Sequence, residues 1–185
     1  MISPGDLRKG IAIELDGVPY QVVDYAHIKV GRGSAQIRLK LRDVREGHLI
    51  ERTFQSGDKW PRARLDRRNA SYLYNDANLY YFMDQENYEQ FTLGDAQVGD
   101  SAGYLKDGMV CEVLLYNDEP IGMELPLNVV LKVVETNPGF RGDTATGGTK
   151  PAKLDTGITV NVPLFINEGD DIKVDTRDGS YIERA

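Results

Sequence analysis

The stretch AQIRLKLR, residues 35–42, alternates strictly between apolar and basic side chains. Its apolar positions are Ile37, Leu39 and Leu41, and its basic positions are Arg38, Lys40 and Arg42. A period of two places the first set on one face of a β-strand and the second set on the other face. We therefore predict a strand with one face in a hydrophobic core and a basic face directed to solvent.

Short strand patterns continue along the whole chain. Residues 11–15 and 20–23 flank Asp16-Gly17, a dipeptide that suits a tight hairpin turn because it tolerates positive φ. Further strands are predicted at residues 71–74, 79–83, 88–93, 110–116, 121–124, 129–136, 153–155, 159–163, 171–174 and 181–183.

One helix is predicted, around residues 94–105, with Asp95 or its neighbour as its cap. Many short strands with frequent turns and a single helix predict an all-β protein built from small barrels. We divide the 185 residues into three modules, 1–64, 65–126 and 127–185. Modules of this size are near the lower limit for an independent core, so neighbours are expected to share buried surface.

Charge is distributed unevenly over these modules. Residues 1–64 hold 12 basic and 8 acidic side chains, residues 65–126 hold 3 and 12, and residues 127–185 hold 7 and 9. Such asymmetry indicates that the first module meets a polyanion and the second does not. Structured RNA is favoured over DNA, because a net charge of −7 would repel a long nucleic acid from most of the surface.

Several classes of protein are excluded by composition and spacing. The single Cys111 cannot form an intramolecular disulfide, and no apolar run approaches the roughly 18 residues of a membrane span, so a cytoplasmic protein without membrane contact is expected. His27 and His48 fall in no catalytic or metal-binding motif. Neither glycine-rich segment, at residues 31–36 or 142–150, matches a nucleotide-binding pattern. We expect no catalytic residues, metal or cofactor, and no enzyme.

The loop Lys29-Val30-Gly31-Arg32-Gly33 precedes the basic strand and resembles a hairpin tip. Gly31 and Gly33 allow the backbone to approach a surface closely. A guanidinium at the apex can stack on a base or bind a phosphate. The alternative interpretation is a solvated turn on a charged strand.

The second module, which is rich in aromatic residues, offers an alternative RNA-binding surface. Bases could stack on these side chains in an oligonucleotide-binding barrel. Because this module is the most acidic one, we expect barrel-core and cross-strand packing instead. The residues in question are Tyr72, Tyr74, Tyr80, Tyr81, Phe82, Tyr88 and Phe91.

Motifs distributed over the full length resemble those of the bacterial elongation factor P family. They comprise DLRKG at 6–10, GRG at 31–33 with the strand IRLKLR at 37–42, YLYND at 72–76, VETNPG at 134–139, GDT at 142–144, and KPAKLDTGITVNVPLFINEG at 150–169. Each short piece is a weak signal, but their order and the length of the last one make the set specific.

The resemblance implies an SH3-like (KOW-type) N-terminal barrel followed by two OB-fold barrels, in an L-shaped arrangement similar to tRNA. It implies a monomeric elongation factor that enters the 70S ribosome between the P and E sites and promotes peptide bond formation on consecutive-proline stalls. The implied partners are P-site peptidyl-tRNA, initiator tRNA, and ribosomal RNA and proteins. The alternatives are a paralogous elongation-factor-P-like protein with a narrower role and an independent OB-fold protein that binds RNA or oligosaccharides.

The same resemblance implies the residues that carry the function. Arg32 would contact the CCA end of P-site tRNA, supported by Lys29, Gly31 and Gly33, while Arg38, Lys40 and Arg42 would contact RNA phosphates. Gly142, Asp143 and Thr144 would face the E-site codon region and the small subunit, and Tyr181 and Arg184 would add contacts.

The apical position departs from the family pattern. Many members carry a β-lysylated lysine there, and another branch carries a rhamnosylated arginine. Arg32 therefore implies a modifying enzyme as a further partner, with the unmodified side chain as the rival.

Overall fold

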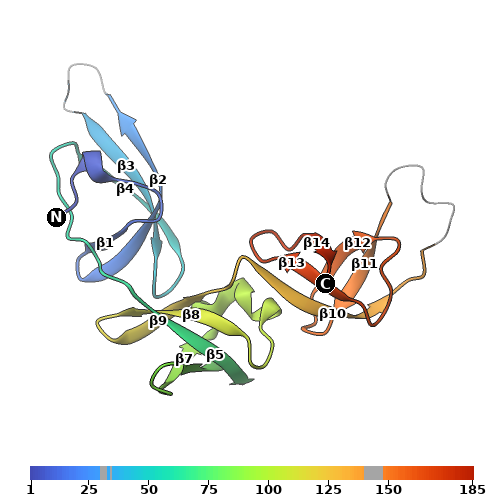
Figure 1. Cartoon of the computed structure of the whole chain (residues 1–185). Coiled ribbons are helices and arrows are strands. Elements are labelled where there is room, and N and C mark those ends of the chain that lie inside the picture. The colour runs from blue at the N-terminus through green and yellow to red at the C-terminus, as the bar shows by residue number, and fades with distance from the viewer. Residues whose placement is uncertain (30–32, 34, 140–147) are drawn as a thin grey trace.

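The computed structural model describes residues 1–29, 33, 35–139 and 148–185. Three antiparallel sheets follow one another along the chain, each within one of the three predicted modules. Figure 1 shows them as three separate lobes that form an open angle, with the second module between the other two. In the described part of the chain, no helix is long and apolar enough to cross a membrane.

The first module contains the sheet β1-β2-β3-β4, in sequence order. Its elements are the 3-10 helix η1 (Pro4–Asp6) and the strands β1 (Ala12–Leu15), β2 (Val18–Ile28), β3 (Gln36–Asp43) and β4 (Leu49–Gln55). The predicted alternation in β3 is confirmed, because Ile37, Leu39 and Leu41 are fully buried while the basic residues between them are exposed.

The turn between β1 and β2 also forms as predicted, with φ values of 53° at Asp16 and 78° at Gly17. The sequence did not predict β4, because Glu51 and Arg52 interrupt its apolar positions. Phe54 of β4 packs edge-on against the buried Trp60 at 5.2 Å between ring centroids. Trp60 forms a bridge with Ile2, which closes this core.

The second module contains the sheet β7-β6-β5-β8-β9. Its strands are β5 (Asp66–Asp76), β6 (Leu79–Asp84), β7 (Gln90–Gly94), β8 (Val110–Tyr116) and β9 (Glu119–Glu124). The single helix predicted here is replaced by two short pieces, α1 (Asp95–Val98) and the 3-10 helix η2 (Gly99–Tyr104). The α-helix ends at Gly99 because this residue adopts a φ of 55°, outside the right-handed helical region.

The third module contains the sheet β12-β11-β10-β13-β14. Its strands are β10 (Asn128–Thr136), β11 (Thr149–Leu154), β12 (Thr159–Pro163), β13 (Asp171–Asp175) and β14 (Tyr181–Arg184). The prediction placed the start of β11 too late, at Lys153, since Pro151 lies within the strand. Alternating buried residues such as Leu131, Val133, Ile172 and Val174 form the core.

Candidate nucleic-acid interface

A long hairpin of β2 and β3 carries the predicted tip of the first module. The two strands pair from Tyr20↔Asp43 to Ile28↔Gln36, and Figure 1 shows this end of the hairpin projecting from the module. Lys29 and Gly33 are exposed at the tip. The predicted apical residues Gly31 and Arg32 lie outside the described residues.

The basic face of β3 is not uniform, because its residues have different cross-strand neighbours. Arg38 lies opposite Ala26 on β2 and Thr53 on β4, whereas Lys40 lies near Asp24 and Glu51, its register partners. Directly opposite side chains are close enough to interact. The charge of Lys40 is therefore offset locally, and that of Arg38 is available to an external anion.

Asp24 strengthens this contrast. A side-chain hydrogen bond with Lys9 lowers the pKa of Asp24, and the charge of Lys40 adds to the effect. The Lys9 Nζ lies 2.9 Å from the Asp24 carboxylate, but both side chains are more than half exposed, so this ion pair contributes little to stability. The Asp24 carboxylate thus lies between Lys9 and Lys40, and both lysines favour its charged form.

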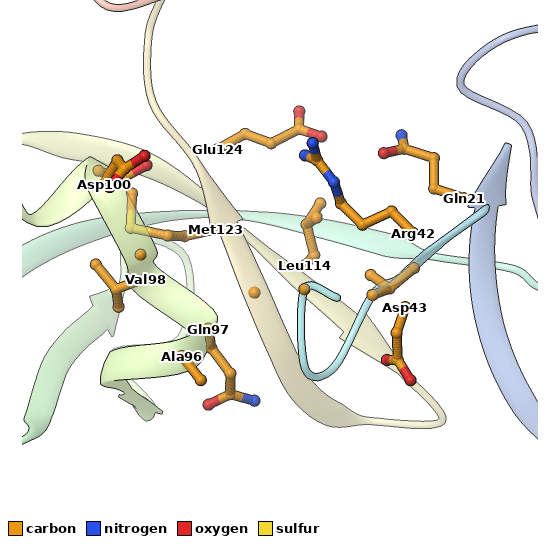
Figure 2. Close-up of a pocket in the computed structure, with 15 residues that line it drawn as sticks. Gln21, Arg42, Asp43, Ala96, Gln97, Val98, Asp100, Leu114, Met123 and Glu124 are labelled. Atoms are coloured by element: carbon orange, nitrogen blue, oxygen red, sulfur yellow. The ribbon is translucent and has the colours of Figure 1, made fainter. Parts of the chain in front are cut away.

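Arg42 lies in a different setting, at a cleft of about 420 Å³ between the first and second modules. Figure 2 shows its side chain extending toward Glu124 at the end of β9, while α1 and η2 line the opposite part of the cleft. Arg42 thus shares a face with Arg38 and Lys40 in sequence, but it is close to an acidic module.

The first and second modules are joined by a partly buried contact that the sequence did not reveal. Tyr116 Oη donates a hydrogen bond to Glu14 Oε2 at 2.5 Å. This hydrogen bond is the largest cause of the raised pKa of Tyr116. The guanidinium of Arg45 lies 5.7 Å from the centroid of the Tyr116 ring and 3.6 Å from Glu119. Tyr116 belongs to a small core together with Ala12, Ala63, Leu114 and Ile121.

The second and third modules meet through η2. Tyr104 and Met109 pack against the core of the third module, and Lys106 Nζ contacts Asp155 at 2.7 Å. Gly103 lies so close to Ile158 that a Cβ at this position would approach the isoleucine side chain to 2.6 Å. The three modules are therefore connected by packed surfaces and not by linkers alone.

The predicted residues of the third module are spread over two places. Gly142, Asp143 and Thr144 lie outside the described residues, beyond the end of β10. Next to this segment, the buried Lys150 donates from Nζ to the backbone oxygen of Asn137 at 2.6 Å. On β14, Tyr181 is half-buried against the core, whereas Arg184 is exposed.

The two histidines and Cys111 each lie in a different setting. His27 is exposed and packs edge-on against Tyr25. Cys111 is buried, and desolvation raises its pKa to about 11. Within the described ranges, Asp43, Glu46 and His48 form the one cluster of potential metal ligands. However, Oδ1 of Asp43 accepts the backbone N–H groups of Arg45 and Glu46, so this aspartate stabilises a turn.

The aromatic residues of the second module divide into buried and exposed groups. Tyr72, Phe82 and Phe91 are buried in the core, as expected. Tyr74 and Tyr81 form a stacked cross-strand pair at 4.8 Å. Tyr88 contradicts the expectation, because it lies in a turn with a φ of 61° and is 71% exposed.

A KOW-like barrel followed by two further small β-barrels, with a basic hairpin at one end, defines a class of translation factors. Three family models match in order: "Elongation factor P (EF-P) KOW-like domain" at residues 3–60, "Elongation factor P (EF-P) OB domain" at 65–123, and "Elongation factor P, C-terminal" at 129–184. The chain belongs to the elongation factor P family and is a translation elongation factor.

Relatives from other organisms match over the full length. Elongation factor P of Moorella thermoacetica is 56% identical and that of Pelotomaculum thermopropionicum is 52% identical, each over 185 residues and 100% of both chains. A solved structure of eukaryotic translation initiation factor 5A from Methanococcus jannaschii is similar in fold, with a TM-score of 0.53 and 23% identity. That similarity covers 68% of this chain and 90% of the other.

Proposed function

We propose that this factor binds the 70S ribosome between the P and E sites and promotes peptide bond formation on consecutive-proline stalls. The observation that carries the proposal is the β2–β3 hairpin, which presents a basic face and leads to an arginine between two glycines. Membership of the elongation factor P family supports the same conclusion.

The proposed mechanism is positional. Proline is a hindered residue with a fixed φ, so the P-site ester and the incoming amine rarely reach the geometry for attack. A factor that holds the CCA end of P-site tRNA in place makes this geometry common, which is an entropic gain that needs no acid or base group. The lack of a catalytic constellation in the sequence is consistent with such a role.

We assign the contact with the CCA end to Arg32, with Lys29, Gly31 and Gly33 supporting the loop. Arg38 and Lys40 contact RNA phosphates, with Arg38 the stronger of the two because no carboxylate lies opposite it. Arg42 contacts phosphate only at the edge of this surface, near Glu124. Contacts with phosphates fix the register of the factor and do not read sequence.

The remaining assignments concern the other end of the molecule. We propose that the factor acts as a monomer of three modules, 1–64, 65–126 and 127–185. The segment Gly142-Asp143-Thr144 faces the E-site codon region, and Arg184 adds a contact from β14, where Tyr181 supports the core. An enzyme that modifies Arg32 is a further partner, and the mass of the Arg32-containing peptide from the native host decides between a bare and a rhamnosylated guanidinium.

Chemical probing of P-site tRNA on purified ribosomes tests this proposal. Adding the full chain to ribosomes that carry initiator tRNA is expected to protect the CCA end, and Arg32→Ala is expected to reduce that protection while the protein still cosediments. Cosedimentation of the unchanged chain without protection of the CCA end would contradict the proposed position.

A further inference from the structure

The strand β6 of the second module, which lies between β7 and β5, is apolar on both faces. Tyr80 and Phe82 point to the core. The alternate residues Leu79, Tyr81 and Met83 belong to the opposite face, where an antiparallel sheet ordinarily presents polar side chains to water. A strand of this kind indicates that a binding partner covers its second face when the protein functions.

Cross-strand pairing extends this outward surface to the neighbouring strands. Tyr81 pairs with Tyr74, and their rings stack at 4.8 Å with an interplanar angle of 26°. Ser71 pairs with Met83 on one side and Val110 on the other, which brings Val110 onto the same face. We call this surface the tyrosine patch; it consists of Tyr74, Leu79, Tyr81, Met83 and Val110.

Three side chains of the tyrosine patch are substantially exposed. The exposed fractions are 56% for Tyr74, 44% for Leu79 and 40% for Val110. Contiguous exposed apolar groups of this kind mark interaction sites more often than isolated ones do. The patch lies on β5, β6 and β8, away from the β2–β3 hairpin of the first module.

Another part of the same sheet shows what kind of group covers an outward tyrosine. Leu114 and Tyr116 lie on the same face of β8 as Val110, opposite the face that carries the core residues Cys111 and Val113. The first module covers Leu114 and Tyr116. The group placed over the Tyr116 ring is the guanidinium of Arg45. Arginine is well suited to this position because its planar, weakly hydrated cation stacks on aromatic faces.

The negative charge around the tyrosine patch also favours a positively charged partner. Asp76 pairs directly with Leu79, and it is exposed in the row next to the stacked tyrosines. The module as a whole holds 3 basic and 12 acidic side chains. A nucleic acid would be repelled by this surface, whereas a basic protein segment would be attracted to it.

We propose that the tyrosine patch binds a basic segment of a partner protein, with an arginine guanidinium stacked on the Tyr74–Tyr81 pair. This contact goes beyond the proposed action at the P site, because it requires neither the hairpin tip nor tRNA. It gives the acidic second module a binding role of its own.

Binding of two labelled peptides to the full chain tests the proposal without ribosomes. One peptide alternates arginine with serine, and the other carries lysine at each arginine position, so their charge is equal. We expect the arginine peptide to bind more tightly, by at most about fivefold, because lysine keeps the charge but lacks the planar cation that stacks on an aromatic face. The Tyr74→Ala/Tyr81→Ala variant is expected to lose this preference.

A matched control comes from the same module. Tyr88 is also exposed but lies in a turn outside the patch, and Tyr88→Asn suits its positive φ, so this variant should keep the preference. Leu79→Lys, which leaves both tyrosines in place, should weaken the binding of both peptides. This variant tests the patch independently of any folding defect in the double variant. Equal binding of the two peptides to the unchanged chain, or a preference that survives without the tyrosines, would overturn the proposal. Binding of oligouridine that depends on the tyrosine patch would also overturn the proposal, because it would identify RNA and not a protein as the ligand.

Discussion

Tyr116 and Glu14, 102 positions apart in the chain, join the first two modules through a hydrogen bond of 2.5 Å at the edge of a buried apolar cluster. Arg45 covers the tyrosine ring from the first module and also contacts Glu119 of the second. These contacts restrict rotation between the two modules. The β2–β3 hairpin is therefore carried by a two-module unit.

Removing the Tyr116 hydroxyl tests this coupling. Tyr116→Phe keeps the ring under Arg45 but leaves the Glu14 carboxylate without its donor, so we expect a loss of about 1–3 kcal/mol in the free energy of unfolding. Urea denaturation measures the loss. The distribution of distances between spin labels on the first and second modules should also become broader. Tyr74→Phe, at an exposed position, is the control, and equal effects of the two variants would contradict the role of Tyr116.

The different neighbours of Arg38 and Lys40 predict unequal effects on ribosome binding. Arg38→Ala is expected to weaken binding and to reduce the dependence of log affinity on log salt by about one phosphate contact. Lys40→Ala should do less, because Asp24 and Glu51 already offset its charge. Cosedimentation at several salt concentrations measures both. A larger effect of Lys40→Ala would show that the register neighbours do not govern these contacts.

Burial of Cys111 predicts a thiol that is inert in the folded protein. Its pKa is raised to about 11 by desolvation, so the nucleophilic thiolate is scarce at neutral pH. The raised pKa also means that this group's contribution to stability is complete below the unfolded value of 9.0 and is lost as the pH rises toward about 11. Alkylation by iodoacetamide at about pH 8 should require unfolding. Rapid alkylation without denaturant would contradict the burial of this residue.

The third module should show an acid-sensitive contact at the β13–β14 turn. Side-chain hydrogen bonds from Arg177 lower the pKa of Asp175 from 3.8 to about 2. Because the folded pKa is depressed, this contribution to stability is complete above 3.8 and is lost as the pH falls through about 2. The unfolding temperature of Asp175→Asn should therefore be lower than that of the parent chain at neutral pH, and the two should be equal near pH 2. A constant difference across this range would assign the effect to another cause.

Local patterns in the sequence predicted much of the first sheet. The alternation of Ile37, Leu39 and Leu41 with basic residues and the Asp16-Gly17 turn depend on neighbours in the chain, and both formed as expected. The interruption of the helix at Gly99 was missed because glycine is compatible with several backbone conformations.

Contacts between modules were the least predictable features. The Glu14–Tyr116 bond and the position of Arg42 at the cleft depend on how the modules pack, which no local pattern encodes. The same holds for the unequal neighbours of Arg38 and Lys40, since these depend on the register of β2, β3 and β4. The candidate site was thus predicted as a set of residues, while their individual environments required the fold.

The yield of a consecutive-proline peptide in a purified translation system tests the central claim most directly. The unmodified chain and Arg32→Ala are compared in a system that lacks any other factor of this family, with a proline-free message as the control. We predict that the unmodified chain raises the yield of the proline peptide alone and that Arg32→Ala does not. Equal rescue by both would remove Arg32 from the mechanism, and no rescue by a chain that carries its native modification would contradict the proposed function.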